Sequence, residues 1–262
     1  MFKKAIIFLF AGFCFFVYGD DFVKNGVAFA YPDWKMKALS FSYDDGHIAD
    51  RQLVAIFNKY GMKGTFHIPH AWLQTKPKKR ISEAEIKADI SGWEKITGKK
   101  ITGYAYPYGS FSPEVISVLK NNGLIYARTV GRDKNFALPA DFLAWNPYGH
   151  HKANIAEAGK KYLQMKPDKM TVMLVWGHSY EFKTAAQWKV IEDFCRQMSG
   201  KDDIFYASMG EIASYVNACR QAVLSKNGKM LKNNSDKQLY FLYKGNKLTV
   251  AADSEYDLNG VK

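Results

Sequence analysis

Two adjacent carboxylates end an apolar stretch of the chain in the sequence SFSYDDGH, residues 40–47. Like charges in neighbouring positions repel each other, so a fold gains no stability from placing Asp44 directly beside Asp45. A polar turn is one interpretation, because Asp-Gly is a common turn pair. The other is a functional site, in which a divalent cation relieves the repulsion and one carboxylate faces an attacking water.

Histidines supply the other groups that could exchange protons or bind a metal. His178 follows the very apolar segment 171–176, where an imidazolium could protonate a departing group; the alternative is a capped core histidine. His67 and His70 have a spacing that suits metal ligands on a helix, but a strand would point them to opposite faces and Pro69 bends the chain between them. A pair of polar loop histidines is the alternative.

Alternating strands and helices are predicted to position these side chains. The pattern of apolar residues, caps and stop signals gives strands at 38–43, 63–68, 101–106, 124–128, 142–145, 171–176 and 204–206, and helices at 48–60, 82–98, 112–122, 155–163, 185–198 and 211–223. About seven strands with helices between them are typical of a parallel sheet with crossover helices. No Gly-rich dinucleotide turn follows any strand, which favours a closed or nearly closed β/α barrel over an open sheet.

The candidate residues fall at one kind of position in this scheme. Asp44, His67, Tyr106, Trp145 and His178 all stand at the C-terminal ends of predicted strands. In β/α barrels the chemistry gathers where these ends meet the loops. The sequence therefore predicts one site at the mouth of the barrel.

The chain divides into three parts. Lys3 and Lys4, an apolar run over residues 5–17 and small residues near Gly19 are typical of a secretory signal peptide, so we expect residues 1–19 to be removed and the protein to be exported to the periplasm or the extracellular space. Residues 20–223 form the predicted barrel. From residue 224 to 262 the sequence is turn-rich and strand-like, which indicates a small β-rich extension.

The composition limits the kinds of binding partner that we expect for this protein. The chain has 262 residues, of which 47% are hydrophobic, enough for one large core. Its formal charge of +12 is spread out apart from KPKKR at 76–80, and no RNA-binding motif or basic recognition helix is present, so we expect no nucleic-acid partner. The apolar run is short for a membrane span, and we expect none after signal cleavage. Cys195 and Cys219 are expected as separately buried thiols, although an oxidising compartment permits a disulfide.

Four segments occur in a recognisable order: SFSYDDG, YAYPYGSF, DFLAW and MLVWGHSYEF. Together they resemble the polysaccharide deacetylase family, carbohydrate esterase family four, over about residues 38–223. The resemblance extends to one bacterial branch through YARTV, the pair His150–His151 and WGHSYEF. It implies an α/β fold, a distorted (β/α)7 barrel of the polysaccharide deacetylase type with the small C-terminal β extension added.

The resemblance also implies a reaction. Asp44 is then the general base, Asp45 a ligand of a divalent metal of the Zn, Co or Ni class, and His178 the catalytic histidine. The substrate is an acetylated polysaccharide or cell-wall glycan, which loses N- or O-linked acetyl groups through metal-activated water. His67 and His70 are candidate further metal ligands.

Substrate contacts follow from two of the motifs. Tyr106, Pro107, Tyr108 and Gly109 correspond to the family's groove motif, and Trp145 matches an aromatic residue that closes the site. An arginine often stands two residues before the motif's proline, but Ala105 occupies that position here, so this contact does not transfer. Trp145, and Asp141 as an orienting group, could equally serve as core and cap.

The chain departs from the family at its second motif. A His-x-x-x-His pair that completes the metal site is missing between Leu73 and Ile81, where only QTKPKKR remains. Two functions therefore stay open: a metal-dependent hydrolase, impaired by the loss of ligands, and a deacetylase-like protein that binds carbohydrate without catalysis. A surface adhesion module is a more distant third. His67, His70 or His47 would have to replace the missing ligands.

Overall fold

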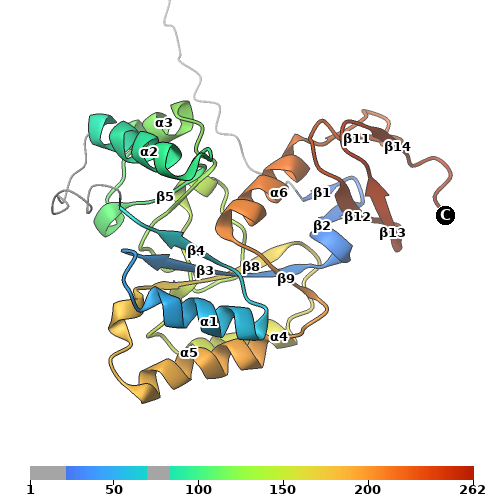
Figure 1. Cartoon of the computed structure of the whole chain (residues 1–262). Coiled ribbons are helices and arrows are strands. Elements are labelled where there is room, and N and C mark those ends of the chain that lie inside the picture. The colour runs from blue at the N-terminus through green and yellow to red at the C-terminus, as the bar shows by residue number, and fades with distance from the viewer. Residues whose placement is uncertain (1–21, 70–82) are drawn as a thin grey trace, which may run out of the picture.

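A five-stranded parallel sheet lies at the centre of the computed structural model, which describes residues 22–69 and 83–262 (Figure 1). Its middle strand is β3 (Lys37–Asp44). On one side β3 pairs with β8 (Thr171–Gly177), which pairs with β7 (Gly149–His150); on the other it pairs with β9 (Ile204–Tyr206) near its start and β4 (Gly64–His67) near its end. Every residue of β3 from Lys37 to Tyr43 is buried, as expected for a strand covered on both faces.

A second, two-stranded parallel sheet continues the barrel wall. It consists of β5 (Gly103–Ala105) and β6 (Tyr126–Arg128), and a single bridge joins Arg128 to Trp145. The helices α2 (Glu83–Thr97) and α3 (Pro113–Asn121) lie outside this sheet, while α1 (Asp50–Tyr60), α4 (Ile155–Gln164) and α5 (Ala185–Met198) lie under the central sheet (Figure 1). The fold is thus α/β with parallel strands, and its barrel is distorted.

Side chains that alternate along β3 separate two cores. Leu39, Phe41 and Tyr43 pack against α1, α4 and α5, whereas Ala38 belongs to a core shared with α6 (Met209–Gln221). The helix α6 begins at Met209, after the Ser208 cap, and not at Glu211 as predicted. Other helix ends lie where the sequence predicts them: α1 stops at Gly61, whose φ of +66° suits glycine, and Ser112 caps α3 through the Val115 N–H.

One predicted strand is wrong. Residues 142–145 form a 3₁₀ turn, η4 (Phe142–Ala144), because the Asp141 carboxylate accepts a hydrogen bond from the Leu143 N–H at 2.8 Å and caps it. Of this segment only Trp145 reaches the sheet, through its bridge to Arg128.

The C-terminal extension is β-rich, as predicted, but it does not stand apart from the barrel. One small sheet consists of β10 (Val223–Leu224), β11 (Met230–Lys232) and β14 (Glu255–Asp257). In the other, β12 (Leu239–Tyr243) pairs with β13 (Asn246–Val250) and also with β2 (Val27–Ala30), which pairs with β1 (Val23–Lys24). Residues 23–30, predicted to belong to the barrel, therefore complete the sheet of the extension.

The structure also bears on the predictions about the cysteines and membrane spans, but not on the signal peptide. Both described cysteines, Cys195 and Cys219, are buried and free, as expected. No helix within the described ranges is long and apolar enough to cross a membrane. The predicted signal peptide, residues 1–19, lies outside those ranges.

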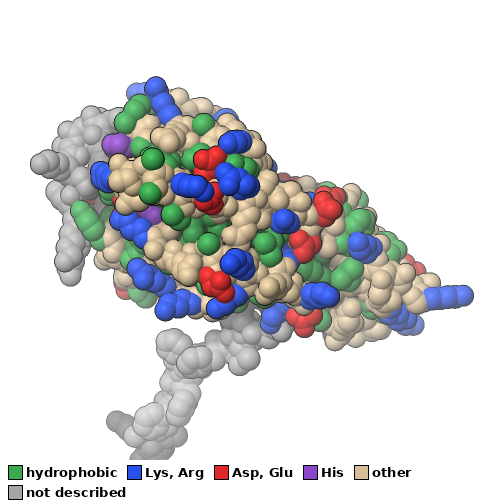
Figure 2. All heavy atoms as spheres, turned by 90° about the horizontal axis from the view of Figure 1, so that it is seen from below, with side chains coloured by type: hydrophobic (Ala, Val, Ile, Leu, Met, Phe, Trp, Pro, Cys, Tyr) green, Lys and Arg blue, Asp and Glu red, His purple; other side chains and the backbone are tan. Residues whose placement is uncertain are grey.

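Figure 2 views the face covered by α1, α4 and α5, on which Lys and Arg side chains are scattered among acidic and apolar ones.

Candidate active site

The paired carboxylates occupy the end of β3. Asp44 is the last residue of the strand, and Asp45 and Gly46 then adopt positive φ angles of +80° and +60°, which turn the chain away. The Asp45 N–H donates to the His67 carbonyl at 2.9 Å. A Cβ atom on Gly46 would lie 2.8 Å from the Ile68 side chain, so the tight turn depends on glycine.

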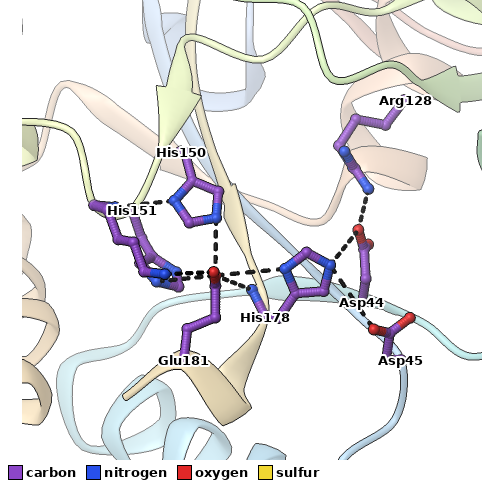
Figure 3. Close-up of polar contacts among 8 residues, drawn as sticks. Asp44, Asp45, Arg128, His150, His151, His178 and Glu181 are labelled. Atoms are coloured by element: carbon purple, nitrogen blue, oxygen red, sulfur yellow. Dashed lines mark hydrogen bonds and ion pairs between the residues drawn. The ribbon is translucent and has the colours of Figure 1, made fainter. Parts of the chain in front are cut away.

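His178 faces both carboxylates from the end of β8. The register of the parallel pair sets Gly177 beside Tyr43, so the next residue on each strand emerges at the same edge of the sheet. His178 Nε2 lies 3.9 Å from Asp44 Oδ2 and 3.8 Å from Asp45 Oδ2 (Figure 3). Three of the residues that the sequence marked for catalysis and metal binding, Asp44, Asp45 and His178, are therefore in one place.

Arg128 holds Asp44 from the neighbouring sheet. Its Nη2 pairs with Asp44 Oδ2, and its Nη1 donates to the Thr129 carbonyl at 2.9 Å. The guanidinium is 1% exposed and stacks on the Trp176 ring, 4.4 Å from the ring centre. Burial raises the pKa of Asp44, and the charges of Arg128 and His178 oppose that rise. Sequence reasoning missed this arginine, although the matched YARTV segment contains it at a strand end.

Glu181 holds His178 from the other side. Its Oε2 lies 3.4 Å from His178 Nδ1 and accepts the His178 backbone N–H at 3.2 Å. His150 Nε2 contacts the same oxygen at 2.8 Å, while Lys152 Nζ contacts Oε1 at 2.5 Å. Burial alone would raise the pKa of Glu181, but these partners outweigh it and lower the pKa to about 2. The carboxylate is therefore anionic at neutral pH.

The His150–His151 pair surrounds this carboxylate. The Lys152 backbone N–H donates to His150 Nδ1 at 3.2 Å, which leaves the proton of a neutral His150 on Nε2. His151 stacks between Tyr43 and Phe182, with ring centres 5.6 and 4.3 Å away. The ligand atoms of His150, His178 and Glu181 lie within 4.8 Å of one another, and such a group could hold a metal ion. Glu181 was not among the predicted residues; its i, i+3 position after His178 in WGHSYEF was the available signal.

Comparisons with known proteins rest on structure, since no family model and no curated protein matches this chain. A putative polysaccharide deacetylase from Mycobacterium smegmatis is similar over 72% of this chain and 93% of its own, with 17% identity and a TM-score of 0.51. A probable polysaccharide deacetylase from Pseudomonas aeruginosa PAO1 is similar over 70% of this chain and 91% of its own, with 12% identity and a TM-score of 0.55. The fold is that of these deacetylases. PuuE allantoinase has the same fold: the similarity covers 70% of this chain and 91% of that protein, with 9% identity and a TM-score of 0.55.

The residues predicted to contact a substrate are only partly accessible. Tyr106 is buried and its hydroxyl donates to the Leu143 carbonyl at 2.7 Å. Trp145 is 1% exposed and packs against Phe142 in the core, so in this structure its ring offers no surface to a substrate. In the turn η3 (Pro107–Gly109), Tyr108 has a φ of +54° and is 65% exposed, which leaves its ring free to contact a ligand.

The predicted metal position at Asp45 has few ligands among the described residues. Burial raises the pKa of Asp45, while the charge of His178 and the nearby Tyr180 hydroxyl oppose that rise. His67 Nε2 is enclosed and has no hydrogen-bond partner in the described part of the chain. Burial, with a smaller effect from the Arg128 charge, lowers the pKa of His67 to about 3. His70 and the stretch without the histidine pair, 73–81, lie within residues that the structure does not describe. The described residues therefore do not complete a three-ligand site at Asp45.

Proposed function

We propose that this protein is a hydrolase that removes acetyl groups, linked through nitrogen or oxygen, from a polysaccharide outside the cytoplasm. The observation that carries the proposal is the placement of Asp44 and His178 about a common space at the carboxyl ends of β3 and β8, in a deacetylase-type fold. A base and an acid that face the same site are what acyl transfer to water requires.

Asp44 presents one carboxylate oxygen to the space that His178 faces. Its Oδ2 pairs with Arg128 and lies 3.9 Å from His178 Nε2, whereas its Oδ1 is enclosed and has no hydrogen-bond partner among the described residues. We expect Oδ2 to accept the proton of a water molecule as the water oxygen attacks the acetyl carbonyl carbon. Arg128 keeps the carboxylate oriented and supplies a compensating charge in a buried site.

His178 has the position of the acid. With Nδ1 directed at the anionic Glu181, its Nε2 is the ring nitrogen that faces Asp44 and Asp45. When the carbonyl–nitrogen or carbonyl–oxygen bond breaks, Nε2–H donates its proton to the leaving amine or alkoxide. The products are acetate and a free amino or hydroxyl group on the sugar.

Family resemblance implies a divalent metal at Asp45, but no group of three ligand atoms that includes Asp45 converges among the described residues. We assign no step of the reaction to this ion. The same observation favours a second candidate function, in which the fold binds acetylated glycan without hydrolysing it.

Acetate release separates the two functions. The purified protein is incubated with N-acetylated chitooligosaccharides, peptidoglycan and O-acetylated xylan, and acetate is measured with and without added Zn²⁺. Asp44→Asn and His178→Gln should each abolish release, while Asp236→Asn, at an exposed site in the extension, should have no effect. Glycan binding by the unaltered protein with no acetate from any substrate would establish the non-catalytic alternative.

A further inference from the structure

We propose that Glu181, His150 and His178 form a binding site for a divalent transition metal of the zinc class, separate from the Asp45 position. Figure 3 shows the three side chains meeting at one carboxylate oxygen, Oε2 of Glu181. The site rests on these residues alone and does not require that the protein hydrolyse acetyl groups.

The spacing of the ligand atoms fits a tetrahedral ion. Bonds of 2.0–2.1 Å from zinc to nitrogen or oxygen place two ligand atoms about 3.3–3.4 Å apart. His178 Nδ1 and Glu181 Oε2 are 3.4 Å apart, and all three ligand atoms lie within 4.8 Å of one another. His150 Nε2, at 2.8 Å from the same oxygen, needs to move outward by about half an ångström to meet the same bond lengths.

The donor types select the metal. Two imidazole nitrogens with one carboxylate are a known ligand set for zinc, and imidazole also suits cobalt and nickel. Mg²⁺ and Ca²⁺ prefer oxygen ligands, of which this cluster offers one carboxylate. We therefore expect selection against the hard cations.

His151 is placed to become a fourth ligand. It is 3% exposed, its Nε2 lies 3.4 Å from Glu181 Oε2, and neither ring nitrogen makes a hydrogen bond within the described part of the chain. The ring is fixed between Tyr43 and Phe182, and Gly177 makes room for it, since a Cβ there would lie 2.0 Å from His151 Nδ1. A small inward shift of Nε2 would close the coordination.

Lys152 lowers the affinity that we expect of this site for a metal ion. Its ammonium group contacts Glu181 Oε1 at 2.5 Å and adds a positive charge next to the ion. Its backbone N–H also keeps the His150 proton on Nε2, the nitrogen that must be free to bind a metal. We therefore expect weaker binding than at a closed structural zinc site. The Lys152 side chain is 56% exposed, so it can be shortened without disturbing the core.

The position of the site differs from that of a water-activating metal at Asp45. Glu181 approaches Nδ1 of His178, while Asp44 and Asp45 approach Nε2, so the imidazole ring lies between the ion and the two carboxylates (Figure 3). An ion bound here fixes the orientation of His178 instead of presenting a water molecule to Asp44.

Metal titration tests the site directly. Chelator-treated protein is titrated with Zn²⁺ by calorimetry, and with Co²⁺ by visible absorption, which reports four-coordinate cobalt. One ion per chain is expected. Glu181→Gln and His150→Ala should each weaken binding by at least about tenfold, or about 1.4 kcal/mol. Lys152→Met should tighten it. His67→Gln is the matched control and should leave the affinity unchanged, and Asp45→Asn should weaken binding far less than Glu181→Gln does.

Two results would overturn the proposal. One is the absence of zinc binding by both the unaltered protein and Lys152→Met. The other is binding that Asp45→Asn abolishes and Glu181→Gln preserves, which would place the metal at the family position. Thermal unfolding checks that each variant is folded, and His150→Ala and Glu181→Gln test the site independently if one of them is not. Because no readout depends on acetate release, failure of this site and failure of the proposed hydrolysis remain distinguishable.

Discussion

Ala105 and Arg128 are direct partners in the parallel pair β5–β6, and the guanidinium that reaches Asp44 comes from Arg128. Family resemblance directed attention to position 105, where an arginine often stands. Side chains of directly paired residues project from the same face of a sheet, so an arginine one strand over can make a contact of the same kind. In this structure an arginine does reach Asp44, and it comes from β6, one strand over from Ala105.

Loss of Arg128 should destabilise the protein and abolish any hydrolysis. Arg128→Ala leaves the buried Asp44 carboxylate without its compensating charge, and breaking a buried ion pair in this way typically costs about 3–5 kcal/mol. Urea unfolding and acetate release measure the two effects. The double variant Arg128→Ala with Ala105→Arg should recover part of both. If the single variant proved as stable as the unaltered protein, the ion pair with Asp44 would not contribute to the stability of the fold.

Removal of the extension should unfold the barrel domain. Phe29 of β2, Phe241 of β12 and Val216 of α6 belong to one buried core, so a chain ending at residue 223 exposes apolar surface on α6. It also leaves β2 paired with β1 alone, without β12 on its other side. We expect loss of a cooperative thermal transition by circular dichroism. A chain shortened only by Val261 and Lys262 is the control. A stable, cooperative 20–223 fragment would contradict the shared core.

Both described cysteines should resist alkylation in the folded protein. Burial raises the pKa of Cys195 and of Cys219 to about 12, so little thiolate exists at pH 8 and reagents cannot reach the sulfur atoms. Mass spectrometry after a short iodoacetamide pulse should show no label on either residue, and full labelling of both in denaturant. Rapid labelling of either thiol under native conditions would contradict the burial.

His67 should make stability fall in mild acid. Its pKa is lowered to about 3 in the folded protein, against about 6.5 in an unfolded chain. Between these values the unfolded state binds the extra proton, so the free energy of unfolding decreases as the pH drops, by up to about 1.4 kcal/mol per pH unit. Urea unfolding of chelator-treated protein measures this between pH 7 and pH 4. The free energy of unfolding should fall less steeply with decreasing pH in His67→Gln than in the unaltered protein. Equal declines would mean that folded His67 accepts the proton.

We propose that the protein is exported and expect its mature N-terminus at Asp20. The basic start and apolar run of residues 1–19 motivate cleavage after Gly19. N-terminal sequencing of protein recovered outside the cytoplasm measures it directly. Recovery of an intact Met1 from the exported fraction would refute the cleavage.

The sequence by itself determined the main helices and strands of the barrel and the positions of Asp44, Asp45 and His178 at strand ends. Local signals carry this information: the apolar run of β3 ends at Asp44, Gly61 stops α1, and each carboxylate or imidazole follows a buried segment. Because parallel strands present their carboxyl ends at one edge, residues that are far apart along the chain could be predicted to meet there.

Tertiary structure alone decided which partners these residues have. Arg128 reaches Asp44 because of the register between β5 and β6 and the packing of that sheet against β3, and no local pattern encodes either. Glu181 and His150 come together because β7 pairs with β8. The same kind of long-range pairing unites β2 with β12, while packing in the core buries Trp145, the residue expected at the substrate. Strand register and core packing depend on contacts between distant segments, so sequence spacing could not reveal them.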